Sequence, residues 1–465
     1  MGHLHERQRA APKRMKRFMY TSLILTMLSL GFLFWICRYD KTFQLWANYL
    51  KINIAARKCI PGKTVLQGQS ASLVTVNGTY TLLVSAYLEH RTKKKEVRVI
   101  AIVLRSEKIS YLCHMRCQEK MHISNGNYYI NKDHFGFPYG TADIMCPLPS
   151  ECKTPSHVAV TSAATKSEDA LHDTFLEVKN QNVTTNSYPY NFTVCLSTMF
   201  DFTNVLQLVQ SLEMFQILGV NRVVVYKTNC SIETQRVLDY YTHKGLIEVI
   251  PWSLSSFLNV SRSWLPKHGP GELHYFGQIP ALTDFLYRYM YKTKYVALHD
   301  IDELILPQSV NSWLELLPML EKQYGADKCY AFQNHVFPNH VWLPPPKPQA
   351  PLPQGHWANV SGVNILDHLY HEPIMRNTSD INFKIILNPR IVFTPTVHGV
   401  VAPKKICRMI NRKVARLYHT RQKQLELKPK ELIYDGRLVG YSARLTPAVD
   451  TVLKDNRLLP PQVGC

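Results

Sequence analysis

The segment KYVALHDIDE, Lys294 to Glu303, decides both the fold and the chemistry expected of this chain. Tyr295 to Leu298 is a short apolar run typical of a buried strand, and Asp300 and Asp302 follow it directly. Side chains two residues apart in an extended chain point to the same side, so both carboxylates are predicted to face one site. Carboxylate oxygens suit Mn²⁺ or Mg²⁺, and such a cation can neutralise a departing diphosphate. The segment therefore predicts a metal site at a strand end.

Around this segment, strands and helices alternate from residue 191 onwards. The strand patterns TVCLSTM, RVVVY and LIEVIPW are separated by helical patterns over 204–218 and 232–241, and a helix over 278–291 precedes the acidic segment. Gly219 is placed to end the first helix. This alternation predicts a Rossmann-type α/β domain over residues 191–445, with a parallel sheet covered on both faces, and a C-terminal tail at 446–465. Ligands of such sheets bind beyond the carboxyl ends of the strands.

The region before this domain has a different pattern. SLVTV, YTLLVSAYL and VRVIAIVL carry the β-branched and aromatic residues of strands, and Asn77-Gly78 is a hairpin signal between the first two. We expect a β-rich module over residues 65–151. Residues 152–190 are rich in Thr, Ser and Asn and poor in large apolar groups, so they are predicted to be a linker.

The N-terminal region predicts a membrane anchor. Residues 18–37, FMYTSLILTMLSLGFLFWIC, form an uncharged run long enough to cross a bilayer as a helix. The flank at 1–17 is strongly basic, which keeps it cytoplasmic and makes everything after the span lumenal. Residues 38–64 are then a stem. A cleaved signal peptide is the alternative, but its apolar core is usually shorter and ends in small residues, whereas this run ends in Phe34, Trp35 and Ile36.

Charge and cysteine content agree with a lumenal, globular body. The formal charge is +20, which indicates an anionic partner, and a lumenal location excludes nucleic acid as that partner. Ten cysteines lie outside the membrane run, an even number that suits disulfides in an oxidising compartment, although buried thiols with fewer bridges remain the alternative. Seven N-glycosylation sequons add modest support: Asn77, Asn182, Asn191, Asn229, Asn259, Asn359 and Asn377. We expect a single-pass type II protein of the Golgi membrane.

Five ordered blocks carry a resemblance to a known family. They are LEMFQILGV with VVVYKTN, then GQIPALTDFLYR, KYVALHDIDELILP, KIILNPRIVFTPTVHGV and ARLYHTR. Over roughly residues 60–445 the chain resembles glycosyltransferase family 92, the former domain of unknown function 23. The resemblance implies a GT-A-like fold and a metal-dependent hexosyltransferase. Members of that family are similar to inverting β-1,4-galactosyltransferases that use UDP-galactose and Mn²⁺ and act on a terminal sugar of a glycan acceptor.

The resemblance also implies roles for individual residues. Asp302 corresponds to a direct metal ligand, and Asp300 to a group that holds the ribose, or the metal through a water. His398 corresponds to a histidine that completes the metal shell, with a buried hydrogen-bonded histidine as the alternative. Donor contacts are implied for Asp284, and contacts to the diphosphate for Lys384 and Arg390, whose alternative is a solvated surface charge. His419 and Arg421 are weaker candidates for the same site.

Inversion needs a carboxylate base on the acceptor side, and three acids are candidates. Asp380 is preferred because the strand pattern INFKIIL follows it, and Asp367 and Glu372 are the alternatives. Two rival functions remain open. One is a catalytically inactive lumenal protein of the same fold that binds glycans or assists folding. The other is a hydrolase in which Asp300 and Asp302 act as acid and base.

Overall fold

The computed structural model describes residues 73–164, 175–183, 187–346, 357–374, 382–422 and 425–459. The cytoplasmic flank, the membrane run at 18–37 and the stem predicted from the sequence lie outside the described residues. Within the described part of the chain, no helix is both long enough and apolar enough to cross a membrane.

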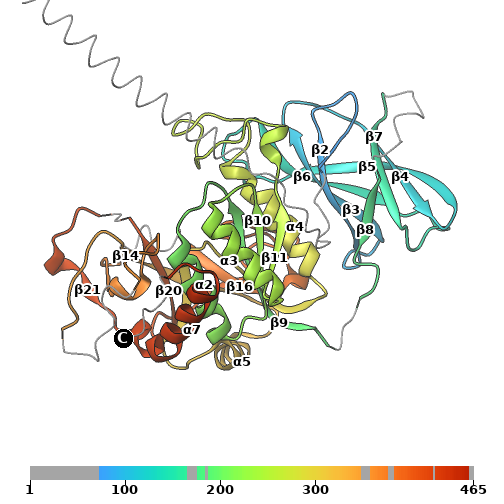
Figure 1. Ribbon diagram of the computed structural model, residues 1–465. Coiled ribbons are helices and arrows are strands. Elements are labelled where there is room, and N and C mark those ends of the chain that lie inside the picture. The colour runs from blue at the N-terminus through green and yellow to red at the C-terminus, as the bar shows by residue number, and fades with distance from the viewer. Residues whose placement is uncertain are drawn as a thin grey trace, which may run out of the picture. The chain divides into compact units, whose positions relative to one another are not determined.

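The β-rich module is an eight-stranded sheet (Figure 1) with the order β1-β2-β3-β6-β5-β4-β7-β8. β8 also pairs with β2, which closes the strands from β2 to β8 into a ring. The predicted hairpin at Asn77-Gly78 is confirmed, because β1 and β2 pair in antiparallel fashion across it. The strands are β1 (Val74–Thr75), β2 (Leu82–Glu89), β3 (Glu96–Leu104), β4 (Tyr111–Cys117), β5 (Lys120–Ile130), β6 (Tyr139–Pro147), β7 (His157–Ser162) and β8 (Leu176–Lys179).

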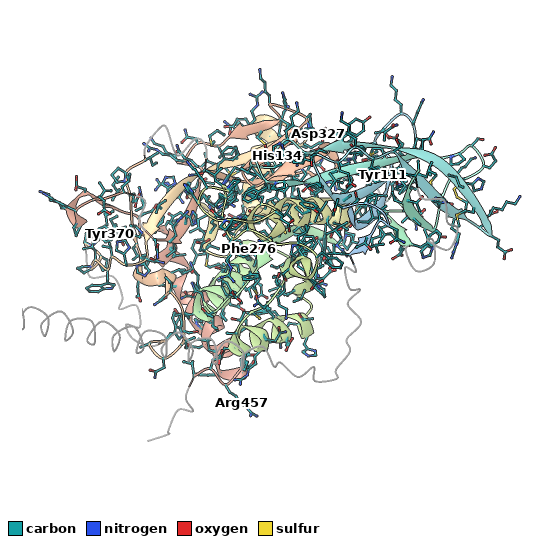
Figure 2. The ribbon with its side chains drawn as sticks, turned by 90° about the horizontal axis from the view of Figure 1, so that it is seen from above. Tyr111, His134, Phe276, Asp327, Tyr370 and Arg457 are labelled. Atoms are coloured by element: carbon teal, nitrogen blue, oxygen red, sulfur yellow. A yellow bond between two sulfur atoms is a disulfide. The ribbon has the colours of Figure 1, made fainter. Side chains whose placement is uncertain are left out.

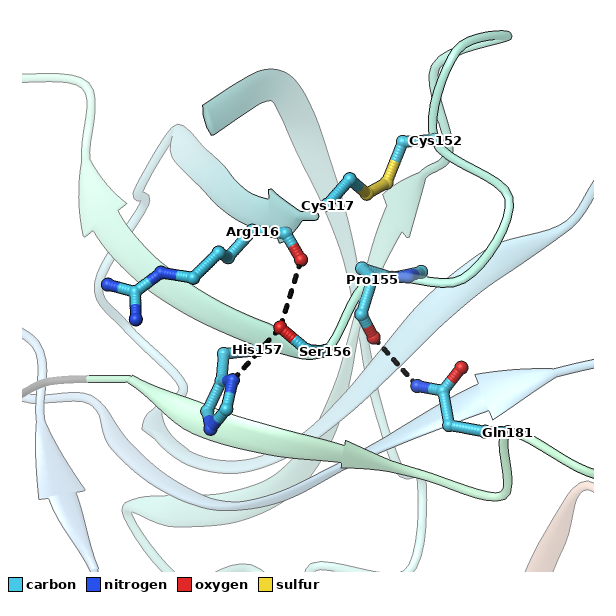
Figure 3. Close-up of a disulfide and its surroundings, with 7 residues drawn as sticks. All are labelled: Arg116, Cys117, Cys152, Pro155, Ser156, His157 and Gln181. Atoms are coloured by element: carbon cyan, nitrogen blue, oxygen red, sulfur yellow. Dashed lines mark hydrogen bonds between the residues drawn. A yellow bond between two sulfur atoms is a disulfide. The ribbon is translucent and has the colours of Figure 1, made fainter. Parts of the chain in front are cut away.

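The prediction of a linker over 152–190 is wrong, because β7 and β8 lie within it and complete the module. Both strands are short: β7 buries the apolar run Val158 to Val160, and β8 buries only Leu176 and Val178, so neither shows an extended alternation in the sequence. The start of this segment is also fixed to the module, as Figure 3 shows: a disulfide joins Cys117 to Cys152, and the Ser156 hydroxyl donates to the Arg116 carbonyl over 3.2 Å.

The α/β domain contains a nine-stranded mixed sheet with the order β11-β10-β9-β12-β16-β14-β20-β13, and β19 pairs with β14. The α/β class and the alternation from β9 to β12 are confirmed, and the first four strands of the order are parallel. The prediction of an all-parallel sheet is wrong beyond β12, because β16 pairs with β12 in antiparallel fashion. The strands of this sheet are β9 (Tyr190–Met199), β10 (Arg222–Lys227), β11 (Ile247–Pro251), β12 (Thr293–Leu298), β13 (Glu303–Pro307), β14 (Cys329–Pro338), β16 (Phe383–Leu387), β19 (Cys407–Met409) and β20 (Ala415–Arg421).

Two short ribbons and five α-helices complete the described part of this domain. β15 (Tyr370–His371) pairs with β21 (Ile433–Tyr434), and β17 (Thr394–Thr396) pairs with β18 (Gly399–Ala402). Gly219 ends the first helix in the left-handed region at φ 98°, as predicted. The helices, which are labelled in Figure 1, are α2 (Val205–Leu218), α3 (Ile232–His243), α4 (Gln278–Tyr289), α5 (Trp313–Tyr324) and α7 (Ser442–Asp455).

The prediction of a tail at 446–465 is wrong for its first ten residues, which continue α7. This helix packs against α2, and it buries Leu445, Val449 and Leu453 completely. The spacing of these three residues, four apart, places them on one helix face. Polar residues between them hide this apolar stripe in the sequence.

The module and the α/β domain share one hydrophobic core. Leu82 and Val84 of β2 belong to the same buried cluster as Phe285 of α4. The Tyr87 hydroxyl donates to Oδ1 of Asp284 over 2.6 Å, and the Arg91 guanidinium donates to the Val392 carbonyl over 2.6 Å. The module is therefore built into the fold of the α/β domain.

Candidate functional site

The acidic segment forms a turn between two strands. β12 ends at Leu298 and β13 begins at Glu303, so Asp300 and Asp302 lie in the connection. The expectation that an extended chain carries both acids is wrong, because Glu303 folds the segment back: its carboxylate accepts from the Asp300 amide over 3.0 Å. Both aspartates nevertheless line one cavity, which lies at the carboxyl ends of β9 and β12.

This cavity has a volume of about 800 Å³ and is lined by groups of three kinds. Acids come from the turn after β12, and polar side chains come from the end of β20 and from the strands beside it. The third kind is aromatic and consists of Phe135, Phe200, Phe202, Trp264, Tyr275 and Phe276. A cavity of this size with convergent polar groups and an aromatic wall is suited to a polar organic ligand that has flat or apolar faces.

Asp300 is held in place by three side chains. Lys384 of β16 lies 2.8 Å from Oδ2, while Ser197 and Gln278 donate to Oδ1 over 3.3 and 3.2 Å. Burial would raise the pKa of Asp300, but the Lys384 charge outweighs it and lowers the pKa to about 2. Asp300 is therefore ionised and fixed in position.

Lys384 lies behind this carboxylate and is 2% exposed. Its ammonium is also 3.4 Å from Oε2 of Glu303, which is itself buried. Burial opposes the charge of Lys384, yet the two carboxylates outweigh it and raise its pKa. The structure thus brings Lys384 to the site, in the position of a counter-ion for two acids.

Asp302 is the more open of the two aspartates, with 36% of its side chain exposed. Nε2 of His419 lies 3.2 Å from its Oδ2, and Nδ1 of the same ring lies 3.4 Å from Oε1 of Glu303. The register of β13 against β20 creates this arrangement, because it pairs Glu303 with His419. Burial lowers the pKa of His419, but the two carboxylates outweigh it and raise the pKa.

Asp302 and His419 supply two ligands of the kinds that bind divalent cations. Among the residues that the structure describes, no group of three or more His, Cys, Asp or Glu side chains is arranged to hold a metal. A cation that binds a nucleotide, however, commonly takes only one or two protein carboxylates and completes its shell with phosphate oxygens and water. One open carboxylate beside one imidazole satisfies that smaller requirement.

Of the remaining predicted residues, His398 also lines the cavity. Its Nδ1 lies 3.1 Å from the Phe383 carbonyl, and its ring stacks on Trp264 at 5.9 Å between centroids. Burial and the Lys384 charge lower its pKa to about 4, so the ring is neutral. A neutral imidazole is the form that binds metals.

The structure does not bring Asp284 or Arg390 to the cavity. Asp284 of α4 is fully buried, and its carboxylate is bound by Tyr87, Tyr226 and Arg288. The Arg390 guanidinium donates to backbone carbonyls, including that of Thr293 over 2.6 Å. Both side chains have structural partners.

The three candidate bases have different outcomes. Asp380 lies outside the described residues. Asp367 lines a separate cavity of about 310 Å³, and burial raises its pKa. Glu372 is buried, and its carboxylate accepts from the Leu425 amide over 3.2 Å.

Sequence reasoning missed several groups of the site. Ser197, Gln278 and Glu303 bind the acidic turn, and His419 was only a weak candidate. A local signal existed for Glu303 alone, which adjoins the motif. The others come from distant parts of the chain and needed the fold to be found.

Backbone strain gathers at this cavity. Nine residues other than glycine have a positive φ in the described part of the chain, and four of them line the cavity: Phe135, Ser197, Tyr275 and Phe276. Phe276, labelled in Figure 2, has φ 52° in the turn that leads into α4. Such conformations cost about 1–3 kcal/mol each and concentrate at functional sites.

Comparison with known proteins finds similarity over the α/β domain. The family model of glycosyltransferase family 92 matches residues 190–438, more than half of the chain. One relative, a glycosyltransferase family 92 protein of Caenorhabditis elegans, is 26% identical over 129 residues, 28% of this chain and 25% of the relative. Another, a β-1,4-galactosyltransferase of the same organism, is 22% identical over 231 residues, 48% of this chain and 50% of the relative. The chain thus spans half or less of the length of each of these relatives.

Proposed function

Since this chain belongs to glycosyltransferase family 92, we propose that it is a metal-dependent galactosyltransferase. It transfers galactose from UDP-galactose to a terminal sugar of glycoprotein or glycolipid glycans, with inversion and in β-1,4 linkage. The relative named as a β-1,4-galactosyltransferase supports the sugar and the linkage. The mixed sheet with its acidic turn at the ends of parallel strands supports a GT-A-type fold for this reaction.

The observation that carries the proposal is the 3.2 Å approach of His419 to Asp302 at the cavity. These two side chains would hold Mn²⁺ or Mg²⁺, and Asp300 and His398 line the same cavity. A cation bound there would supply the positive charge that neutralises a departing diphosphate. Arg421, which also lines the cavity, adds a second positive group for the phosphates.

Lys384 contributes to this site indirectly, through the two carboxylates that it contacts. It fixes Asp300 and Glu303, and these in turn hold the turn that carries Asp302. A preorganised turn keeps its charges in place during the reaction, and such fixed groups stabilise developing charge better than mobile ones do.

The acceptor hydroxyl needs a base on the face opposite the leaving diphosphate. We assign that role to Asp380. Asn382, two residues further along the chain, lines the cavity at the start of β16, which supports this choice. Asp380→Asn would then lose transfer while it keeps UDP affinity, and unchanged transfer would exclude Asp380 as the base.

A location in the Golgi lumen, behind a type II anchor, completes the proposal. Support comes from disulfides in the described residues, which suit an oxidising compartment. They join Cys113 to Cys146, Cys117 to Cys152, and Cys329 to Cys407. N-glycosidase treatment of the protein from secretory cells should reduce its apparent mass, whereas no change would argue against lumenal exposure.

The decisive experiment measures UDP release by the purified full-length chain in detergent, across nucleotide-sugar donors and glycan acceptors, with and without Mn²⁺. Release should require UDP-galactose, an acceptor and the cation. Asp302→Asn should reduce it by about 10²–10³-fold. Asp327→Asn, which changes an exposed acid away from the cavity, is the matched control. A wild-type chain without release for any donor would favour the catalytically inactive alternative, and sugar cleavage without a nucleotide would favour the hydrolase.

A further inference from the structure

We propose that the β-rich module builds part of the acceptor site, where the Phe135 ring of the module, met edge-on by Trp264 of the α/β domain, forms a platform on which the acceptor pyranose stacks. This inference rests on the proposed transferase function and deepens it. Phe135 is the residue of the module that lines the main cavity in the described part of the chain.

The loop that carries Phe135 is fixed against the α/β domain. It connects β5, which ends at Ile130, to β6, which begins at Tyr139. The Tyr139 amide donates to the Glu272 carbonyl of the α/β domain over 2.9 Å. Within the module, the Arg105 guanidinium donates to the Phe137 carbonyl over 2.5 Å. The position of Phe135 at the cavity is therefore built into the fold.

The Phe135 ring is supported on one face. It stacks on His274 with centroids 4.1 Å apart and planes 15° apart, and it meets Trp264 edge-on at 5.8 Å. His274 is buried, whereas Phe135 is only half-buried and lines the cavity. Since His274 covers one face of the ring, the opposite face is the part available to a ligand.

A row of rings connects this platform to the acidic turn. Trp264 stacks on Tyr275 at 4.8 Å with planes 19° apart. Tyr275 lines the cavity together with Asp300 and Asp302. Phe135 thus lies two rings away from the group that would hold the cation. The diphosphate and the donor hexose would occupy the space next to the cation, so the more distant Phe135 ring remains for the acceptor.

The chemistry of the platform matches a sugar ring. A pyranose has a face of C–H groups that packs on an aromatic ring, while its hydroxyls need hydrogen-bonding partners at the rim. Amide side chains of Asn334, Asn339 and Asn382 line the same cavity and can supply those partners. A nucleobase has another candidate surface, since Phe200 and Phe276 stack at 4.6 Å near the end of β9.

The experiment compares three substitutions of Phe135 in the full-length chain, in the same transfer assay. Phe135→Ala and Phe135→Leu should raise the KM for the acceptor roughly three- to tenfold, with the KM for UDP-galactose and the Kd for UDP unchanged. Phe135→Tyr should restore the acceptor KM, because it keeps a flat ring. Tyr129→Ala, which removes a 65% exposed aromatic from β5 of the same module, is the control and should behave as wild type.

Each alternative result has a defined meaning. A Phe135→Leu variant with a wild-type acceptor KM would overturn the stacking role, because leucine keeps apolar packing without a flat face. A change confined to the KM for UDP-galactose or to UDP affinity would also overturn it, by moving Phe135 to the donor. Thermal midpoints of all variants identify any loss of folding.

A failure of the proposed function would be seen separately, as a wild-type chain that transfers no sugar to any acceptor. The platform is then tested by saturation-transfer NMR with methyl β-galactoside and methyl β-N-acetylglucosaminide. Signals that Phe135→Ala abolishes and Tyr129→Ala preserves would support it. The absence of signals with the wild-type chain would overturn it.

Discussion

Replacement of Lys384 by methionine tests whether this residue is a structural counter-ion or a ligand for the diphosphate. Its side chain is 2% exposed, and its ammonium lies 2.8 Å from Asp300 and 3.4 Å from Glu303. At an effective dielectric constant of about 20, a pair 2.8 Å apart attracts by about 6 kcal/mol before desolvation is subtracted. Breaking a buried pair from one side typically costs about 3–5 kcal/mol, because the remaining charge stays buried without compensation.

We therefore expect Lys384→Met to lower the free energy of unfolding by about 4 kcal/mol, a value taken from that range. Asp300→Asn should cost less, since Lys384 keeps Glu303 as a partner. In the double variant the two effects should not add, and the coupling should reach about 2–3 kcal/mol. The assay is urea unfolding of the full-length chain in detergent, followed by tryptophan fluorescence, together with a measurement of UDP affinity.

Either of two results would refute the assignment of Lys384 as a structural counter-ion. If Lys384→Met unfolds at the same urea concentration as wild type and loses only UDP affinity, Lys384 is a diphosphate ligand, as the family resemblance implied. Additive effects of Lys384→Met and Asp300→Asn would likewise show that the two charges do not depend on each other.

Four further outcomes are expected. Asp284→Asn should destabilise the chain by about 3 kcal/mol, since it leaves the buried Arg288 with the more distant Glu248 carboxylate at 3.9 Å, and urea unfolding would show this. Burial lowers the pKa of His274 to about 3, so its contribution to stability is complete above pH 6.5 and shrinks as the pH falls toward 3. The His274→Phe variant should therefore become more stable relative to wild type as the pH falls from 6.5 toward 3. Thermal midpoints of the two proteins with the same pH dependence would contradict this. Replacement of Cys329 and Cys407 by serine should lower the free energy of unfolding by about 2–4 kcal/mol. Urea unfolding measures this, and an unchanged midpoint would exclude a stabilising disulfide. EDTA should abolish UDP release and Mn²⁺ should restore it, whereas full activity in EDTA would exclude a requirement for a divalent cation.

The sequence predicted those parts of the fold that depend on local periodicity. The order from β9 through α4 to β12 follows from alternation of short apolar runs with helical spacing, and Gly219 ends α2 because only glycine adopts its φ of 98° readily. The direction of β16 could not be predicted, because the connection before it is long and allows either orientation. The strands β7 and β8 were missed because each buries too few apolar side chains to stand out from a loop.

In the candidate site, too, local sequence patterns could be predicted and contacts between distant segments could not. The acidic turn could be found from the sequence because its carboxylates adjoin an apolar strand. Lys384 and His419 are about 80 and 120 residues away in sequence, and only the pairing of β12 with β16 and of β13 with β20 brings them to the turn. Asp284 was predicted to contact the donor because it lies in a sequence block shared with the family. In the structure its carboxylate instead forms an ion pair with Arg288, one helical turn later.

The core that the module shares with the α/β domain has a consequence for any comparison of relatives. Similarity to the family begins at residue 190, but the cluster around Phe285 and Tyr87 begins more than a hundred residues earlier. A chain cut at the similarity boundary would expose one side of α4, with the Asp284 carboxylate stripped of a hydrogen bond. The β-rich module and the α/β domain must therefore be inherited, exchanged or expressed together, although the family resemblance detects only the second.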